Sequence, residues 1–138
     1  MNLLIDTNCL IYFFYGKHEA FASWFVNIEA QNIFVSSLTI FELLKGFGYI
    51  ESKKGMEYVN DIAKTYKILD FTLEDAREAS KIYDNLKKSG NRNDSLDVLL
   101  ASQAINHKLT LTTFNYQDFE KIGKLKLKKF YFETAPKK

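Results

Sequence analysis

The chain has 138 residues, a formal net charge of +2 and a hydrophobic content of 46%, which is the composition of one globular domain of ordinary size, here expected over residues 1–138. This charge is too small to indicate a nucleic-acid-binding protein by itself, and no apolar stretch is long enough to cross a bilayer. With one cysteine, Cys9, and no N-terminal secretory signal, an internal disulfide is excluded, a zinc site is disfavoured and a cytoplasmic location is expected.

The first predicted element is a short strand that ends at an acid. Leu3, Leu4 and Ile5 form an unbroken apolar run, which is typical of a strand buried on both faces of a parallel sheet. Asp6 follows directly, and Thr7 begins the polar cap of a helix. Because ligand sites form beyond the carboxyl ends of parallel strands, Asp6 is either a candidate ligand or merely a helix cap.

Helices and further strands alternate along the rest of the chain. The spacing of apolar residues, with Gly16 and Gly90 as breaks and Thr72 and Asp75 as a reciprocal cap, predicts these elements in order: helices 10–15 and 20–28, strand 32–36, helices from Ser37 and over 56–66, strand 67–71, helix 72–90, helix 95–106, strand 109–113, a turn at 115–119 and strand 128–132. This alternation predicts an α/β fold, a mostly parallel sheet with helices on both faces.

Acidic and amide side chains gather at the strand ends and helix starts of this fold. They are Asp6, Glu42, Asp94, Asp97, Asn115 and Asp118. Two like charges 4 Å apart cost about 4 kcal/mol at an effective dielectric near 20, so several carboxylates at one edge of a sheet call for a cation or for shifted pKa values. Oxygen ligands without His or Cys favour Mg²⁺ or Mn²⁺.

Each acid also has a purely structural interpretation. Glu42 stands three residues after Thr39 and completes a capping-box pattern. Asp97 stands three residues after Asp94, where a first-turn acid meets the helix dipole. Asp118 suits the cap of a short turn. The lysines of residues 124–128 alternate as in an edge strand, where they block aggregation or bind phosphate.

Four motifs in sequence order carry a family resemblance over nearly the whole chain. They are Ile5-Asp6-Thr7-Asn8, Ser36-Ser37-Leu38-Thr39-Ile40-Phe41-Glu42-Leu43, Gly90 with Asp97-Val98-Leu99-Leu100-Ala101, and Thr113-Phe114-Asn115-Tyr116-Gln117-Asp118-Phe119. With them the chain resembles PIN-domain proteins, specifically the VapC-type toxins of bacterial and archaeal toxin–antitoxin pairs. The resemblance implies a three-layer α/β/α sandwich.

The resemblance implies that Asp6, Glu42 and Asp97 bind Mg²⁺, or Mn²⁺, in an endoribonuclease that cleaves RNA with metal-activated water. Asp97 is preferred over Asp94 because the family's acid lies seven residues after the Gly and directly precedes three apolar residues and an Ala. The family's fourth acidic position is Asn115 here, so either Asn115 or Asp118 completes the site.

The remaining roles concern RNA and protein partners. By the same resemblance, Thr7, Asn8 and Thr113 orient water or phosphate, while Arg92 and Lys45 meet the RNA backbone or stay at a solvated surface. The resemblance also implies a homodimer and a cognate antitoxin whose C-terminal segment covers the acids. The segment 41–66 holds more large apolar residues than one helix face needs, which favours it as the partner site.

Two other functions fit part of the pattern. Asn115 in place of an acid suggests a non-catalytic binding module with a depleted metal site, and metal-dependent cleavage separates the two. Asp6 and Asp70 at two strand ends suggest a phosphoacceptor domain of the receiver type. That chemistry needs a lysine at the end of a later strand, and Thr112-Thr113-Phe114 supplies none.

Overall fold

The computed structural model describes residues 1–91 and 93–132. Its centre is a five-stranded sheet in the order β3-β2-β1-β4-β5, and each neighbouring pair is parallel. The strands are β1 (Leu3–Ile5), β2 (Ile33–Ser36), β3 (Lys67–Leu69), β4 (Thr110–Thr113) and β5 (Lys126–Lys129). The predicted α/β fold is confirmed, and the sheet is parallel throughout the described strands.

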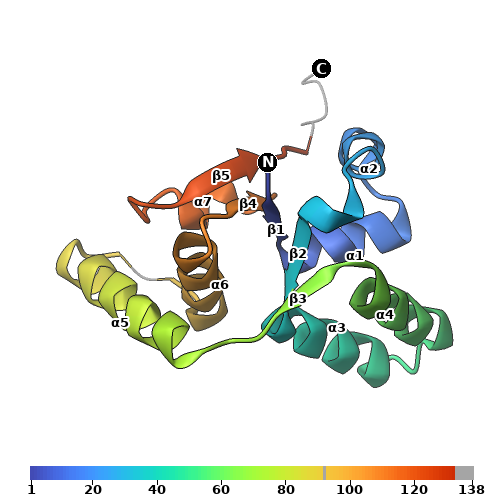
Figure 1. Cartoon of the computed structure of the whole chain (residues 1–138), viewed down its shortest axis with the longest axis horizontal. Helices are drawn as coiled ribbons and strands as arrows, with labels where there is room; N and C mark the ends of the chain where they lie inside the picture. Colours follow the sequence, from blue (N-terminus) through green and yellow to red (C-terminus); the bar gives the residue numbers. More distant parts are fainter. Residues whose placement is uncertain (92, 133–138) are drawn as a thin grey trace, which may run out of the picture.

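Helices cover both faces of this sheet, which makes the three-layer sandwich (Figure 1). The helices are α1 (Thr7–Tyr15), α2 (Glu19–Phe25), α3 (Ser37–Tyr49), α4 (Lys53–Thr65), α5 (Leu73–Lys88), α6 (Ser95–Asn106) and α7 (Tyr116–Phe119), with a 3-10 turn at η1 (Ala30–Asn32). Helices α1 to α4 pack on one face and α5 to α7 on the other. In the part of the chain that is described, no helix is long and apolar enough to cross a membrane.

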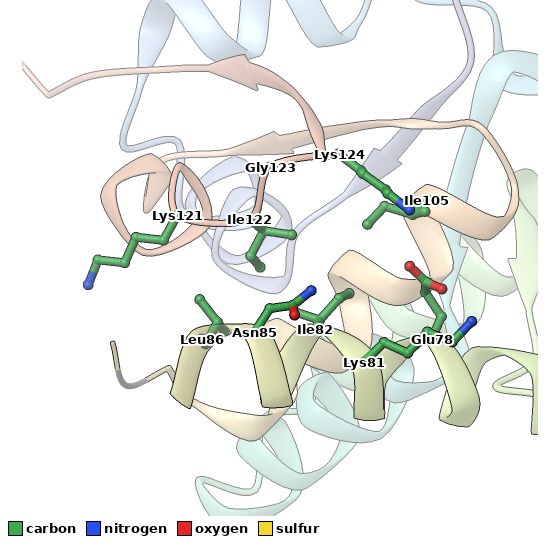
Figure 2. Close-up of a pocket in the computed structure, with 10 residues that line it drawn as sticks. All are labelled: Glu78, Lys81, Ile82, Asn85, Leu86, Ile105, Lys121, Ile122, Gly123 and Lys124. Carbon is green, nitrogen blue, oxygen red and sulfur yellow. The ribbon is translucent and has the colours of Figure 1, made fainter. Parts of the chain in front are cut away.

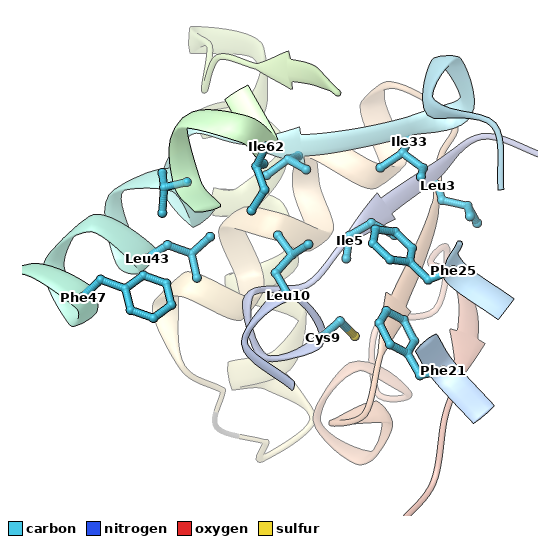
Figure 3. Close-up of a cluster of buried hydrophobic side chains, with 12 residues drawn as sticks. Leu3, Ile5, Cys9, Leu10, Phe21, Phe25, Ile33, Leu43, Phe47 and Ile62 are labelled. Atoms are coloured by element: carbon cyan, nitrogen blue, oxygen red, sulfur yellow. The ribbon is translucent and has the colours of Figure 1, made fainter. Parts of the chain in front are cut away.

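Strand β1 is buried by both layers, as its apolar run predicts. Leu3 and Ile5 point into the core under α1 to α4, where Phe21 and Phe25 stack beside them (Figure 3). Leu4 points to the opposite core under α5 and α6. Because successive side chains of a strand alternate between faces, three apolar residues in a row anchor both halves of the molecule.

Two helices begin three residues earlier than the sequence predicts, and in both a polar side chain caps the new start. Asp6 caps α1 through the Thr7 N–H, so this helix starts at Thr7 rather than Leu10. Ser52 accepts a hydrogen bond from the Gly55 N–H at 3.0 Å, so α4 starts at Lys53 rather than Met56. The apolar spacing identified these helices but not their polar first turns.

The last strand was predicted over 128–132 and lies over Lys126–Lys129 instead. Its position is set by pairing with β4, in which Lys126 aligns with Thr110 and Lys129 with Thr113. Residues 130–132 run past the end of β4 and turn their aromatic rings onto the end of the sheet. The edge position of β5 is confirmed, while the expectation of one domain over 1–138 extends beyond the described residues and stays a prediction.

Helices α3 and α4 form a hairpin whose close contact depends on a glycine. A Cβ atom at Gly55 would lie 2.2 Å from the ring of Phe47, which is itself only 4% exposed. The Phe47 ring has little room to move because it packs on Phe14, with 4.9 Å between the ring centroids. Glycine is therefore required here by close approach rather than by an unusual backbone conformation.

We expect Gly55→Ala to lower the free energy of unfolding by about 1–3 kcal/mol, since an added methyl group forces the buried Phe47 ring to shift. Gly48→Ala is the control: a Cβ there meets nothing within 4 Å, so better helix propensity should raise stability by about 0.5–1 kcal/mol. Urea unfolding followed by circular dichroism measures both. A Gly55→Ala protein as stable as Gly48→Ala would contradict the packing.

Candidate active site at the acidic edge of the sheet

Asp6 is held at the carboxyl end of the central strand by two hydrogen bonds. One carboxylate oxygen accepts the Thr7 N–H at 2.7 Å, and the other accepts the Thr113 hydroxyl, which comes from the end of β4, at 2.8 Å. The residue is 6% exposed, and this burial raises its pKa, while both hydrogen bonds act to lower it. Each oxygen keeps a further lone pair, so the fixed carboxylate can both cap α1 and bind a ligand.

Asp97 lies in the first turn of α6, close enough to Asp6 for the Asp6 charge to raise its pKa. Burial, together with the charges of Asp6, Asp94 and Asp118, raises the pKa of Asp97 from 3.8 to about 7. Charges act strongly on one another only over short distances, so this shift identifies an acidic cluster. We call Asp6, Asp97 and Asp118 the acidic rim.

Asp118 is oriented by the neutral residue that replaces the expected fourth acid. The Asn115 side-chain NH₂ donates to the Asp118 carboxylate at 2.6 Å, and the Asn115 backbone N–H donates to the Thr113 hydroxyl at 2.9 Å. The Thr113 hydroxyl therefore accepts a hydrogen bond from the Asn115 backbone N–H and donates one to the Asp6 carboxylate. In this arrangement Asp118 contributes the charge and Asn115 fixes its position.

Glu42 stands apart from the acidic rim, on a neighbouring helix. Helix α3 is joined to α1 by a hydrogen bond of 3.1 Å from the Thr7 hydroxyl to the Thr39 hydroxyl. The capping-box interpretation is wrong, because Ser36 caps α3 and Thr39 lies inside the helix, fully buried. The Glu42 carboxylate lies 3.7 Å from the Lys45 ammonium in a half-exposed pair, a weak interaction that Glu42 can leave.

The other predicted residues are not part of the acidic rim. Asp94 caps α6, accepting the Leu96 N–H at 3.0 Å, as its structural interpretation requires. Asn8 is exposed on the first turn of α1. Asp70 follows β3, and β2 separates that strand from β1, so Asp6 and Asp70 do not end neighbouring strands. Arg92 lies outside the described residues.

The donor set of this edge fits a hard divalent cation. Its donors are carboxylate and amide oxygens, and the raised pKa of Asp97 reflects negative charge that a cation would neutralise. Over residues 1–91 and 93–132, however, no three His, Cys, Asp or Glu side chains already stand close enough to hold one ion together. A bound cation would therefore keep several water ligands, as Mg²⁺ commonly does.

A separate cavity of about 330 Å³ contains none of these residues. It lies between α5 and residues 121–124 and is lined by polar and apolar side chains together (Figure 2). Three lysines and one glutamate surround it: Lys81, Lys121, Lys124 and Glu78. This cavity is therefore separate from the acidic rim.

Comparison with known proteins identifies the family. The family model described as the PIN domain matches residues 3–125. The chain belongs to the PIN-domain family. Two curated PIN-domain relatives are Ribonuclease VapC2 of Rickettsia felis, 30% identical over 130 residues (91% of this chain, 95% of that protein), and Ribonuclease VapC of Rickettsia bellii, 29% identical over 131 residues (92% and 95%).

A solved structure agrees with this PIN-domain assignment. The crystal structure of VapBC2 from Rickettsia felis bound to a DNA fragment from its promoter superimposes with a TM-score of 0.85 at 23% identity, covering 94% of this chain and 99% of that chain. At 23% identity the superposition shows the fold alone, while the two VapC ribonucleases that match in sequence show which kind of PIN domain this is. The PIN domain described here is a VapC-type ribonuclease.

Two residues of the PIN-domain site were missed by the sequence interpretation. Thr39 was considered only as a cap, yet its buried hydroxyl joins α3 to α1. Asn93, which lies between two predicted helices and received no role, donates its side-chain NH₂ to the Asp118 carbonyl at 2.6 Å and so joins the segment before α6 to α7. The sequence held one signal for Thr39: it lies one helical turn before Glu42, so both side chains are on the same face of the helix.

The repulsion at the acidic rim predicts a pH-dependent stability of the metal-free protein. The folded-state pKa of Asp97, about 7, lies above its ordinary value of 3.8, so the folded state binds this proton more tightly than the unfolded state does. The free energy of unfolding should therefore fall as the pH rises through this interval, and Asp97→Asn should remove part of that fall. Thermal melts in chelator between pH 4 and about 8 measure it. Equal pH profiles for both proteins would contradict the repulsion.

Proposed function

We propose that this ribonuclease hydrolyses phosphodiester bonds of RNA with Mg²⁺, or Mn²⁺, held by Asp6, Asp97 and Glu42. Asn115 or Asp118 completes the ligand set. The observation that carries the proposal is the placement of Asp6 and Asp118 beyond the ends of β1 and β4, where Thr113 holds Asp6 at 2.8 Å and Asn115 holds Asp118 at 2.6 Å. Asp97 is near enough for both of these charges to raise its pKa. A cation bound there would lower the pKa of a water molecule and neutralise charge on the phosphoryl oxygens.

The chain's own residues prepare this edge for the reaction. Thr113 and the Thr7 N–H fix both oxygens of Asp6, so that carboxylate needs no reorganisation when a ligand arrives. Asn115 fixes Asp118 in the same way. Asn8, which is exposed on α1, and Thr7 are available to orient water or phosphate. Arg92 and Lys45 are proposed contacts to the RNA backbone.

We expect Asp6→Asn and Asp97→Asn each to abolish RNA cleavage while the protein stays folded, because both carboxylates would share the cation. Asp94→Asn is the matched control: it changes an acid in the same helix turn that only caps α6, so activity should persist with a loss of about 1 kcal/mol in stability. Cleavage of total cellular RNA with Mn²⁺ or with chelator, followed by mapping of the cut ends, measures the activity.

Full activity in both acid variants would overturn the metal assignment. Induction in growing cells gives a second measurement: the wild-type chain should stop growth and its Asp6→Asn form should not. Normal growth with abundant soluble wild-type protein would contradict a toxin.

The proposed antitoxin site is the apolar surface of the α3–α4 hairpin. A hollow of about 170 Å³ opens there between α1 and α3, lined by Ile11, Tyr15, Glu42, Leu43, Gly46, Phe47 and Ile50. Near it Tyr49 is 89% exposed and Ile50 56%. An amphipathic segment of a partner would cover this surface. An Arg or Lys at its end would reach Asp6, Glu42 and Asp97 in place of the metal. The homodimer implied by the resemblance stays a prediction, which light scattering tests.

Replacing Tyr49 and Ile50 together by Asp should weaken antitoxin binding more than RNA cleavage, because both side chains are exposed at the end of α3 away from the acidic rim. Calorimetry with the cognate antitoxin and the cleavage rate, each for wild type and double variant, measure the two effects. Unchanged affinity in a folded variant would place the partner elsewhere. Inhibition by the antitoxin should also weaken as Mn²⁺ is raised.

A further inference from the structure

The segment after β5 returns to the same edge of the sheet as the acidic rim. The Phe130 N–H donates to the carbonyl of Thr113 at 3.1 Å, and Thr113 in turn donates its hydroxyl to Asp6. His18 holds the next residue: its Nδ1 accepts the Phe21 N–H at 3.0 Å, so its Nε2 donates to the carbonyl of Tyr131 at 2.7 Å. Residues 130–132 therefore form a fixed strap beside the site.

Tyr131 and Phe132 leave this strap towards different neighbours, both close to the site. The Tyr131 ring packs edge-on against Tyr116, with 4.7 Å between centroids, and Tyr116 follows Asn115 directly. The Phe132 ring stacks on Phe114, with centroids 4.9 Å apart and planes 25° apart. Each ring is thus supported from behind by an aromatic residue adjacent to Asn115.

Both rings remain open on their outer side. Tyr131 is 55% exposed and Phe132 49%, so about half of each residue is accessible to a ligand. Positive charge lies near them: the Lys128 ammonium lies 5.2 Å from the Phe130 ring centroid, and the Lys129 ammonium, which pairs with the Glu120 carboxylate, lies 5.5 Å from that of Tyr116. The surface therefore combines exposed aromatic faces with lysines, next to a group of acids that repels phosphate.

We propose that Tyr131 and Phe132 form a stacking platform for bases of single-stranded RNA beside the scissile phosphate. The proposal rests on the proposed function, because it names the part of the substrate that the same site holds. Bases stack on exposed aromatic rings whatever their sequence, and lysines bind the phosphates between them. A duplex cannot use this platform, because pairing and stacking cover its base faces.

The stacking platform also supplies attraction for RNA beside the acidic rim, whose negative charges repel phosphate. Before a cation binds, Asp6, Asp97 and Asp118 repel an RNA backbone, so attraction must come from groups that the acids do not oppose. Stacking on Tyr131 and Phe132 is uncharged, and Lys128 adds positive charge near the end of β5, whereas Lys129 is paired with Glu120. An acidic peptide would meet the same repulsion without the stacking, which favours RNA as the occupant.

The test measures binding of a short fluorescent single-stranded oligoribonucleotide, by anisotropy in chelator, so that no cleavage is needed. Tyr131→Ala and Phe132→Ala should each weaken binding by about tenfold, while Tyr131→Phe should bind like wild type, because the ring is kept. Tyr83→Ala is the control for loss of an exposed tyrosine: Tyr83 is 52% exposed on α5 and belongs neither to the acidic rim nor to the proposed antitoxin surface. Melting curves check that all four variants are folded.

Abasic nucleotides separate stacking from a structural role. Replacing the bases one at a time should weaken wild-type binding at one or two positions, and Tyr131→Ala should lose that sensitivity because the stacking partner is already gone. Wild type that binds no single-stranded RNA, alanine variants that bind like wild type, or unchanged abasic sensitivity would each overturn the platform. Loss of antitoxin affinity instead of RNA affinity would assign the surface to a protein partner. Absence of cleavage with Mg²⁺ would instead contradict only the proposed function.

Discussion

The structure depends on one buried carboxylate at the end of its central strand. Asp6 is desolvated, which is costly for a charge, and the Thr113 hydroxyl and the Thr7 N–H offset that cost. The same contacts cap α1 and tie the end of β1 to the end of β4. The residue that joins β1, β4 and α1 is therefore also the one that we propose as a ligand of the cation.

The strand order explains how acids from distant segments meet. Strand β1 lies between β2 and β4, so the helix after β2, which carries Glu42, and the loop after β4, which carries Asn115, both begin beside Asp6. Helix α6 brings Asp97 to the same edge. The pKa of Asp97 is raised mainly by burial and also by repulsion from the neighbouring carboxylates, and a divalent cation would relieve that repulsion.

Local signals allowed much of this to be predicted from the sequence. The apolar run before Asp6 gave the central strand, and Thr72 with Asp75 gave a reciprocal cap that the structure contains. The acids of the rim were identified by position at strand ends and by family motifs. Features that depend on residues far along the chain could not be predicted. Strand β5 is shifted because pairing with β4 fixes its register. The roles of Thr39 and Asn93 come from hydrogen bonds to other elements.

The pairing of β1 with β4 has a consequence for the timing of synthesis. Thr113 lies 107 residues after Asp6, so the ribosome must deliver most of the chain before the hydrogen bond between them forms. Such long-range pairing is late in folding because its chain-closure entropy must be paid first. A fragment released before Thr113 lacks the partner that fixes Asp6, together with β4, and it has no place to assemble the acidic rim. The acidic rim is therefore complete only when translation of the chain is nearly finished.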